Sequence, residues 1–256
     1  MNPETAAKSE KSLNRFTTTR WSMVLSCAES GTDEDKARRA LADLCRIYWR
    51  PVFAFICRRG RSVPDAQDLT QSFFLMLLEG GLLQRADPNR GRFRSLLLTA
   101  LKQFLIDDSL RKSALKRGGN MQFVSWDAWM AEAPSNFAIP AAEAESWPAE
   151  KLYDVRWAAT AVEHALRRLG EECESRGRRR VFDVLGDWLA AEREDVSYKE
   201  LSKTLGVPET SVKRLLHQLR IRYRELLREE VAQTVEKSGD VDEELRYLCA
   251  ALATAS

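Results

Sequence analysis

The sequence predicts an all-α fold with two helical domains joined by an acidic linker, the C-terminal one a helix-turn-helix domain. Apolar residues recur at helical spacing through most of the 256 residues. A pair of helical patterns separated by a tight turn occupies 197–230. Residues 1–120 hold 21 Lys+Arg against 13 Asp+Glu, whereas residues 121–150 hold five carboxylates and no cation. The expected units are a disordered arm at 1–16, a helical domain at 17–117, the linker at 118–150, the helix-turn-helix domain at 151–235 and a tail helix in 236–256.

Composition limits where the protein works and which groups it could bind. No apolar run approaches the roughly 18–20 residues of a membrane helix. The stretch from Met1 to Lys11 also lacks the apolar centre of a signal peptide. The five cysteines are scattered without a C-x-x-C pair, and His164 and His217 are the only histidines. We therefore expect a reduced, cytoplasmic protein with no membrane insertion, no metal site and no cofactor.

Helical patterns fill the front half of the chain, and two of them carry candidate contact surfaces. On the helix that begins near Pro64, Asp65, Asp68 and Gln71 face outward as an acidic patch, of which helix capping explains Asp65 alone. A turn-rich loop at 86–92 leads into the next helix, whose basic edge fits a nucleic-acid contact or an ordinary solvated face. The members of this edge are Arg92, Arg94, Lys102, Gln103, Arg111, Lys112, Lys116 and Arg117.

Local signals in the back half define the helix-turn-helix. The RGRRR run at 176–180 begins one helix. Ser197 followed by Glu200 predicts a capping box at the start of the next helix. Gly206 predicts a left-handed end to that helix, and Pro208 permits a new start directly after it.

The outward face of the final helix of this motif carries cations and short hydrogen-bonding side chains. It has no carboxylate between Thr210 and Arg224. Its members are Thr210, Ser211, Lys213, Arg214, His217, Gln218 and Arg220. Such a face fits a major groove, where bases offer hydrogen-bond acceptors and phosphates offer negative charge. The alternative is a solvated face on an ordinary helical pair.

The order of these blocks resembles bacterial RNA polymerase sigma factors, in the extracytoplasmic-function group of the sigma-70 family. The segments that carry the resemblance are DAQDLTQ, then FRSLLLTALKQFLIDDSLRK, then YKELSKTLGVPETSVKRLLHQLRIRYRELL. It covers about residues 20–117 and 155–232, which are similar to sigma regions 2 and 4. Leu96, Gln103 and Leu215 depart from the family, which commonly has tryptophan, asparagine and arginine at these positions.

The resemblance implies a factor that binds core RNA polymerase and promoter DNA, starts transcription, and has an anti-sigma factor as a further partner. It implies a polymerase contact at Asp65, Asp68 and Gln71. It implies contact with a downstream promoter element by Asn89, Arg92, Phe93, Arg94, Lys102, Gln103, Arg111 and Lys112. It implies contact with an upstream element by Tyr198, Lys199, Thr210, Ser211, Lys213, Arg214, His217 and Gln218. The acidic linker would enter the polymerase channel that later holds RNA, or else shield the chain's own basic faces.

Two other functions stay open on the sequence. A helix-turn-helix regulator would bind DNA without polymerase, and its front half would sense a ligand or dimerise. A DNA recombinase-type enzyme would need a catalytic serine, tyrosine or acid cluster in residues 1–120, where none is recognisable. The chain also lacks the G-x-x-x-x-G-K, G-x-G-x-x-G and G-x-S-x-G motifs, so we expect no enzymatic activity and no catalytic residue.

Overall fold

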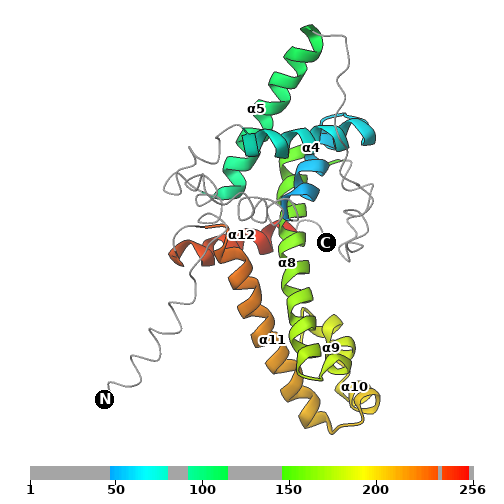
Figure 1. Cartoon of the computed structure of the whole chain (residues 1–256). Helices are drawn as coiled ribbons and strands as arrows, with labels where there is room; N and C mark the ends of the chain where they lie inside the picture. The colour runs from blue at the N-terminus through cyan, green and yellow to red at the C-terminus, as the bar shows by residue number, and fades with distance from the viewer. Residues whose placement is uncertain (1–46, 80–91, 115–145, 236–237, 254–256) are drawn as a thin grey trace, which may run out of the picture.

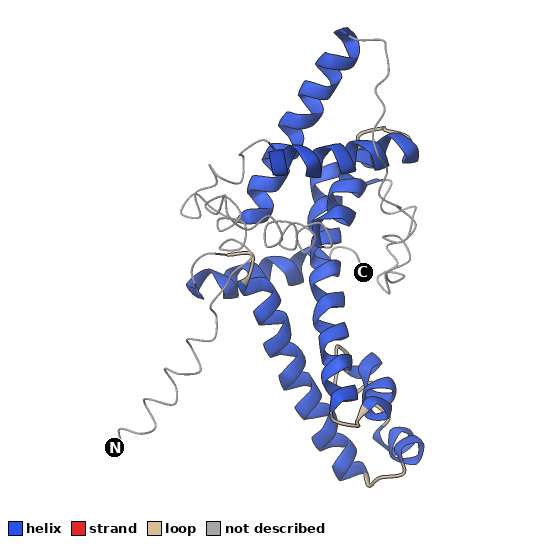
Figure 2. Cartoon of the chain, in the orientation of Figure 1, coloured by secondary structure: helices blue, strands red, loops and turns tan. Residues whose placement is uncertain are grey.

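The structure is a computed structural model that describes residues 47–79, 92–114, 146–235 and 238–253. Within these ranges the chain forms helices, turns and loops but no strand, so the predicted all-α fold is confirmed (Figure 2). One helix spans 47–58, and the others are α4 (Val63–Glu79), α5 (Phe93–Ala114), α8 (Ala149–Ser175), α9 (Arg179–Leu185), η2 (Gly186–Trp188), α10 (Tyr198–Leu205), α11 (Glu209–Ala232), η3 (Ser238–Asp240) and α12 (Val241–Ala253). None of the described helices is long and apolar enough to cross a membrane.

Two long helices organise the molecule. The helices α8 and α11 lie side by side and run in opposite directions (Figure 1). At one end they carry α9 and α10, and at the other end α4, α5 and the helix at 47–58 gather around α8. The C-terminal helix α12 packs on both α8 and α11 where α11 ends. The helix-turn-helix therefore projects from a body that contains most of the remaining described helices.

One apolar core joins the front helices to the back half of the chain. Its buried members include Tyr48, Phe73, Phe93 and Leu101 from the front and Tyr153, Trp157, Val231 and Leu248 from the back. The first half of α8 thus packs in the same core as the front helices, although the sequence placed it in a separate domain. The expected linker lies outside the described residues as far as position 145, and Trp147 near its end is buried.

The second half of α8 belongs to a different core, under the helix-turn-helix. Ala165, Leu169 and Cys173 of α8 are buried there against Leu185 and Leu201. Ion pairs fasten α8 to α11 along the same stretch. Arg222 contacts both carboxylate oxygens of Glu172 at 2.6 and 2.8 Å, and Arg168 donates to Glu229 and Glu230 at 2.6 and 2.9 Å. One continuous helix therefore connects the two cores mechanically.

Candidate nucleic-acid interface

The turn between α10 and α11 is built as the sequence predicts. Gly206 has a φ of 70°, in the left-handed region where a side chain is strained. The amides of Gly206 and Val207 both donate to the carbonyl oxygen of Ser202, at 2.9 and 3.2 Å. Pro208 then occupies the position before the first residue of α11. The predictions for Gly206 and Pro208 are confirmed.

The capping box predicted at the start of α10 is wrong in its side-chain bonds. Ser197 does occupy the N-cap position, but its side chain makes no cap hydrogen bond. Its ψ of 80° departs from the extended geometry that aims a cap hydroxyl at the helix amides. The carbonyl oxygen of Ser197 instead accepts the amides of Glu200 and Leu201, each at 3.1 Å.

A buried apolar stripe fixes the orientation of α11. Val212 and Leu216 are 0% and 1% exposed, and Leu219 is also buried beneath the motif. The opposite side of the helix consequently faces solvent. Thr210, Lys213, Arg214, His217 and Gln218 are exposed there, and Ser211 is half-buried. Six of the residues proposed from the sequence therefore form one outward surface, which we call the recognition face.

One flank of the recognition face is formed by α10. The ammonium group of Lys213 lies 5.1 Å from the centre of the Tyr198 ring, a cation–π contact that restrains a long side chain. Lys199, the next residue of α10, is exposed. Both α10 residues named from the sequence thus stand beside the recognition face, at the N-terminal end of their helix.

Arg220 belongs to the structure of the motif, and its expected place on the recognition face is wrong. Its Nη2 donates to the carbonyl oxygens of Trp188 and Ala191, at 2.9 and 2.5 Å. Arg180 is used in a similar way, because its Nη2 donates to the carbonyl oxygen of Thr204 at 2.9 Å. The carbonyls of Trp188 and Thr204 lie in the last turns of η2 and α10, where a cation offsets their partial negative charge, and Ala191 lies in the bend after η2.

Most described cations of the basic edge expected on α5 bind carboxylates of the protein itself. Arg94 is only 6% exposed, and Phe93 is 1% exposed with its ring 5.4 Å from that of Tyr48. The Nε of Arg94 donates to Glu244 of α12 at 2.6 Å, and its Nη1 donates to Asp154 of α8 at 2.7 Å. Phe93 and Arg94 cannot meet DNA in this arrangement, so their predicted role is corrected.

Electrostatics explains why Arg94 stays charged at this depth. Burial alone lowers the pKa of the Arg94 guanidinium. The hydrogen bond and charge of Glu244 and the charge of Asp154 raise this pKa by more than burial lowers it. The guanidinium also lies 4.0 Å from the centre of the Tyr247 ring and 5.4 Å from that of Trp157. We call Arg92, Arg94, Asp154, Glu244 and Tyr247 the clasp.

The other residues named for α5 and its loop are scattered. Arg92 contacts Glu243 and Glu244 of α12 at 3.0 and 2.8 Å, and Lys102 contacts Glu150 at 2.9 Å. Gln103 is exposed and donates to Asp107 at 3.1 Å. Asn89 lies outside the described residues, as do the side chains of Arg111 and Lys112. The described members of this edge do not assemble a second DNA surface.

The acidic patch on α4 lies where the sequence put it. Asp65 and Asp68 are exposed and Gln71 is half-buried. The hydroxyl of Ser62 donates to the Asp65 carboxylate at 2.7 Å and accepts its amide at 3.3 Å. Capping thus accounts for Asp65, and contact of this patch with another protein stays a prediction. No group of metal-binding side chains occurs among the described residues.

Comparison with known proteins assigns the motif. Residues 179–221, from the start of α9 into α11, match the IclR helix-turn-helix domain. No curated protein and no solved structure matches the chain. The match points to a DNA-binding transcriptional regulator, in agreement with the regulator alternative raised from the sequence.

The same match corrects the family suggested by the sequence. An IclR-type helix-turn-helix contradicts the resemblance to extracytoplasmic-function sigma factors. Turn glycine, proline start and apolar spacing are shared by helix-turn-helix motifs of many kinds, so the back-half block could not separate the two families. The polymerase, promoter-element and anti-sigma assignments lose the argument on which they were based.

Proposed function

We propose that the protein is a transcriptional regulator that binds duplex DNA by inserting the first half of α11 into the major groove. The observation that carries the proposal is the recognition face. Its five exposed side chains, Thr210, Lys213, Arg214, His217 and Gln218, stand directly over a buried apolar core. An element held rigidly by packing places such side chains more reproducibly than a loop would.

Each type of side chain on the face has a partner in the groove. Arg214 lies at its centre and is suited to a guanine, whose O6 and N7 accept two parallel hydrogen bonds. Gln218 is suited to adenine for the same geometric reason. Lys213 and Lys199 are suited to phosphates, which position the helix without reading sequence. The sequence preference is therefore assigned to Arg214 and Gln218, and much of the affinity to the lysines.

The long helices give the domain a fixed platform. Ion pairs of Arg222 and Arg168 hold α11 against α8, and the first half of α8 is buried in the main core. A change in that core would move the helix-turn-helix as a unit. The front half thus supplies the body through which DNA binding is coupled to the rest of the protein.

A binding-site selection from random duplexes tests the proposal. The wild-type protein is expected to enrich a motif, and Arg214→Ala to relax it at one base pair by about 1–3 kcal/mol of discrimination. Arg246→Ala is the matched control, because Arg246 is exposed on α12, a helix at the opposite end of α11 from the helix-turn-helix (Figure 1). Failure of the wild-type protein to enrich any motif or to bind any duplex would contradict the proposal.

A further inference from the structure

The sharp turn between α8 and α9 has a defined geometry. The amide of Arg178 donates to the carbonyl oxygen of Cys173 at 2.7 Å, and the amide of Gly177 donates to that of Glu174 at 2.9 Å. With Gly177 at a φ of 65°, this is a Schellman termination of α8. The turn therefore fixes the backbone of Arg176 and Arg178, which stand on either side of the glycine.

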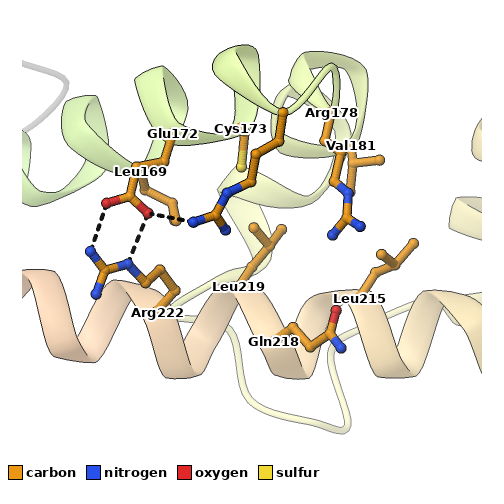
Figure 3. Close-up of a pocket in the computed structure, with 10 residues that line it drawn as sticks. Leu169, Glu172, Cys173, Arg178, Val181, Leu215, Gln218, Leu219 and Arg222 are labelled. Atoms are coloured by element: carbon orange, nitrogen blue, oxygen red, sulfur yellow. Dashed lines mark hydrogen bonds and ion pairs between the residues drawn. The ribbon is translucent and has the colours of Figure 1, made fainter.

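Both arginines border a hollow between α8 and α11. The hollow has a volume of about 180 Å³, and its apolar floor includes Leu169, Val181 and Leu219. Figure 3 shows the side chain of Arg178 extending over this floor towards α11, and Arg176 also lines the hollow. Two cations are thus presented beside the recognition helix by a turn that is itself outside the matched motif, at 176–178.

These two guanidinium groups are weakly engaged compared with their neighbours. Arg179 is held by Asp183 at 2.8 Å, and Arg180 by the carbonyl of Thr204 at 2.9 Å. Arg176 is 4.0 Å from Glu172, whose carboxylate is already bound by Arg222 at 2.6 and 2.8 Å. The guanidinium of Arg178 makes no hydrogen bond or ion pair with any residue that the structure describes.

The turn stands on the flank of the recognition face that α10 leaves open. Lys213 and Gln218 are five residues apart and hence about 140° apart around the helix, with Arg214 and His217 between them. Lys213 contacts Tyr198 of α10, whereas Gln218 borders the hollow under Arg176 and Arg178. The exposed face is therefore bounded by α10 on one side and by the two arginines on the other.

We propose that Arg176 and Arg178 bind backbone phosphates along the edge of the major groove opposite to the edge contacted by α10. The inference rests on the proposed function. A helix in a groove about 12 Å wide has a phosphate strand on each side. The basic turn meets the second strand with two long, charged side chains, and Lys199 and Lys213 meet the first. Such contacts raise affinity for every sequence and leave the sequence preference to the recognition face.

Salt dependence is the measurement that isolates this role. The affinity of the full chain for its selected duplex and for a random duplex is measured over a range of salt concentrations. For Arg176→Ala/Arg178→Ala we expect weaker binding to both duplexes by the same factor. The slope of log affinity against log salt should become shallower by about 2, one unit for each lost contact. Arg176→Lys/Arg178→Lys should keep most of the slope, since a phosphate accepts a point charge.

Arg167 provides a closely matched control. It precedes Arg176, the C-cap of α8, by nine residues and hence by about 180° around the helix. It is 62% exposed against 65% for Arg176, and it has the same kind of partner four residues away, Glu171 at 3.7 Å. Arg167→Ala/Arg246→Ala removes the same charge as the alanine pair and should leave the salt slope unchanged. Circular dichroism of each variant confirms that the helices persist.

Four outcomes overturn the proposal in distinguishable ways. An alanine pair with the wild-type slope and affinity removes the phosphate role while the proposed function stands. An alanine pair that loses preference for the selected duplex shows base reading instead. Competition by inorganic phosphate, in the wild type but not in the alanine pair, shows a site for small anions. Absence of DNA binding by the wild-type protein removes the proposed function as well.

Discussion

Arg94 on α5 and Arg214 on α11 are cations on amphipathic helices whose apolar faces are buried. Arg94 is 6% exposed and is bound by Glu244 and Asp154, with two aromatic rings over or beside it. Arg214 is exposed, on a stretch of helix that carries no carboxylate. The first arginine joins three helices, and the second is presented to solvent. Helical spacing alone does not distinguish them.

The difference lies in what each guanidinium gains when it leaves water. A buried charge is tolerated only with full pairing, because desolvation costs several kcal/mol per ion. The clasp provides that pairing from positions far apart in the sequence, 94, 154 and 244. A site that must later bind phosphates or bases requires the reverse, namely cations whose hydrogen-bonding capacity is unused. The clasp thus stabilises the fold, and the recognition face remains available for DNA.

The largest expected effect comes from removing the buried anion of the clasp. Glu244 is fully buried, so Glu244→Ala leaves the charge of Arg94 without its nearest partner. We expect the free energy of unfolding in urea to fall by about 3–5 kcal/mol. A loss below about 1 kcal/mol would mean that the clasp contributes little to stability. The contrast between a stabilising clasp and an exposed recognition face would then be wrong.

A paired replacement shows whether the loss comes from an unpaired charge. Arg94→Met/Glu244→Leu removes both charges and keeps apolar volume, so it should cost much less than Glu244→Ala. Equal losses for the two variants would indicate that packing of α12, rather than charge, stabilises the contact between α5, α8 and α12.

The next effect tests the turn that presents the recognition face. A Cβ at Gly206 would meet no atom within 4 Å, so Gly206→Ala adds backbone strain alone, at a φ of 70°. We expect it to lower the free energy of unfolding by about 1–2 kcal/mol. Gly239→Ala, equally open but without a positive φ, should stay within about 0.5 kcal/mol of wild type. Equal effects at both glycines would exclude strain as the cause.

The smallest effect concerns the ion pair between Glu172 of α8 and Arg222 of α11. Its side chains are half-buried, so it is intermediate between the buried clasp and the exposed recognition face. The hydrogen bond from Arg222 lowers the pKa of Glu172, against a raising effect of burial. A depressed pKa means that the pair stabilises the fold above the unfolded value near 4.3 and loses this contribution as pH falls further. Glu172→Gln should cost about 0.2–1 kcal/mol at pH 7 and almost nothing at pH 3. A cost independent of pH would argue against the ion pair.

Local features of the fold were predictable from the sequence, and distant pairings were not. Gly206, Pro208 and the apolar stripe of α11 follow from backbone preferences and helical spacing, which act over a few residues. The pairing of Arg94 with Glu244 joins positions 150 residues apart, and no local pattern distinguishes a cation so paired from an exposed one. The hydrogen bonds from Arg220 to two carbonyl oxygens could not be predicted for the same reason.

The resemblance to sigma factors was misleading for a related reason, because it depended on local patterns that other helix-turn-helix proteins share. The departures at Leu96, Gln103 and Leu215 were the signal against it, because each replaces a residue type that the sigma pattern commonly has. Leu215 faces the hollow beside Leu219, so an apolar residue there serves packing of α11. The outward position of the residues named on α11 was predicted correctly apart from Arg220, since outward positions follow directly from the buried ones.

A crossed measurement on Arg94→Ala and Arg214→Ala tests the central claim most directly. For each variant, the unfolding free energy in urea and the affinity for the selected duplex are measured on the same sample. Arg214→Ala is expected to keep the wild-type stability within about 0.5 kcal/mol and to lose about 1–3 kcal/mol of discrimination at one base pair. Arg94→Ala is expected to lose stability and to keep the sequence preference of whatever fraction remains folded. Wild-type affinity and preference in Arg214→Ala would contradict the account.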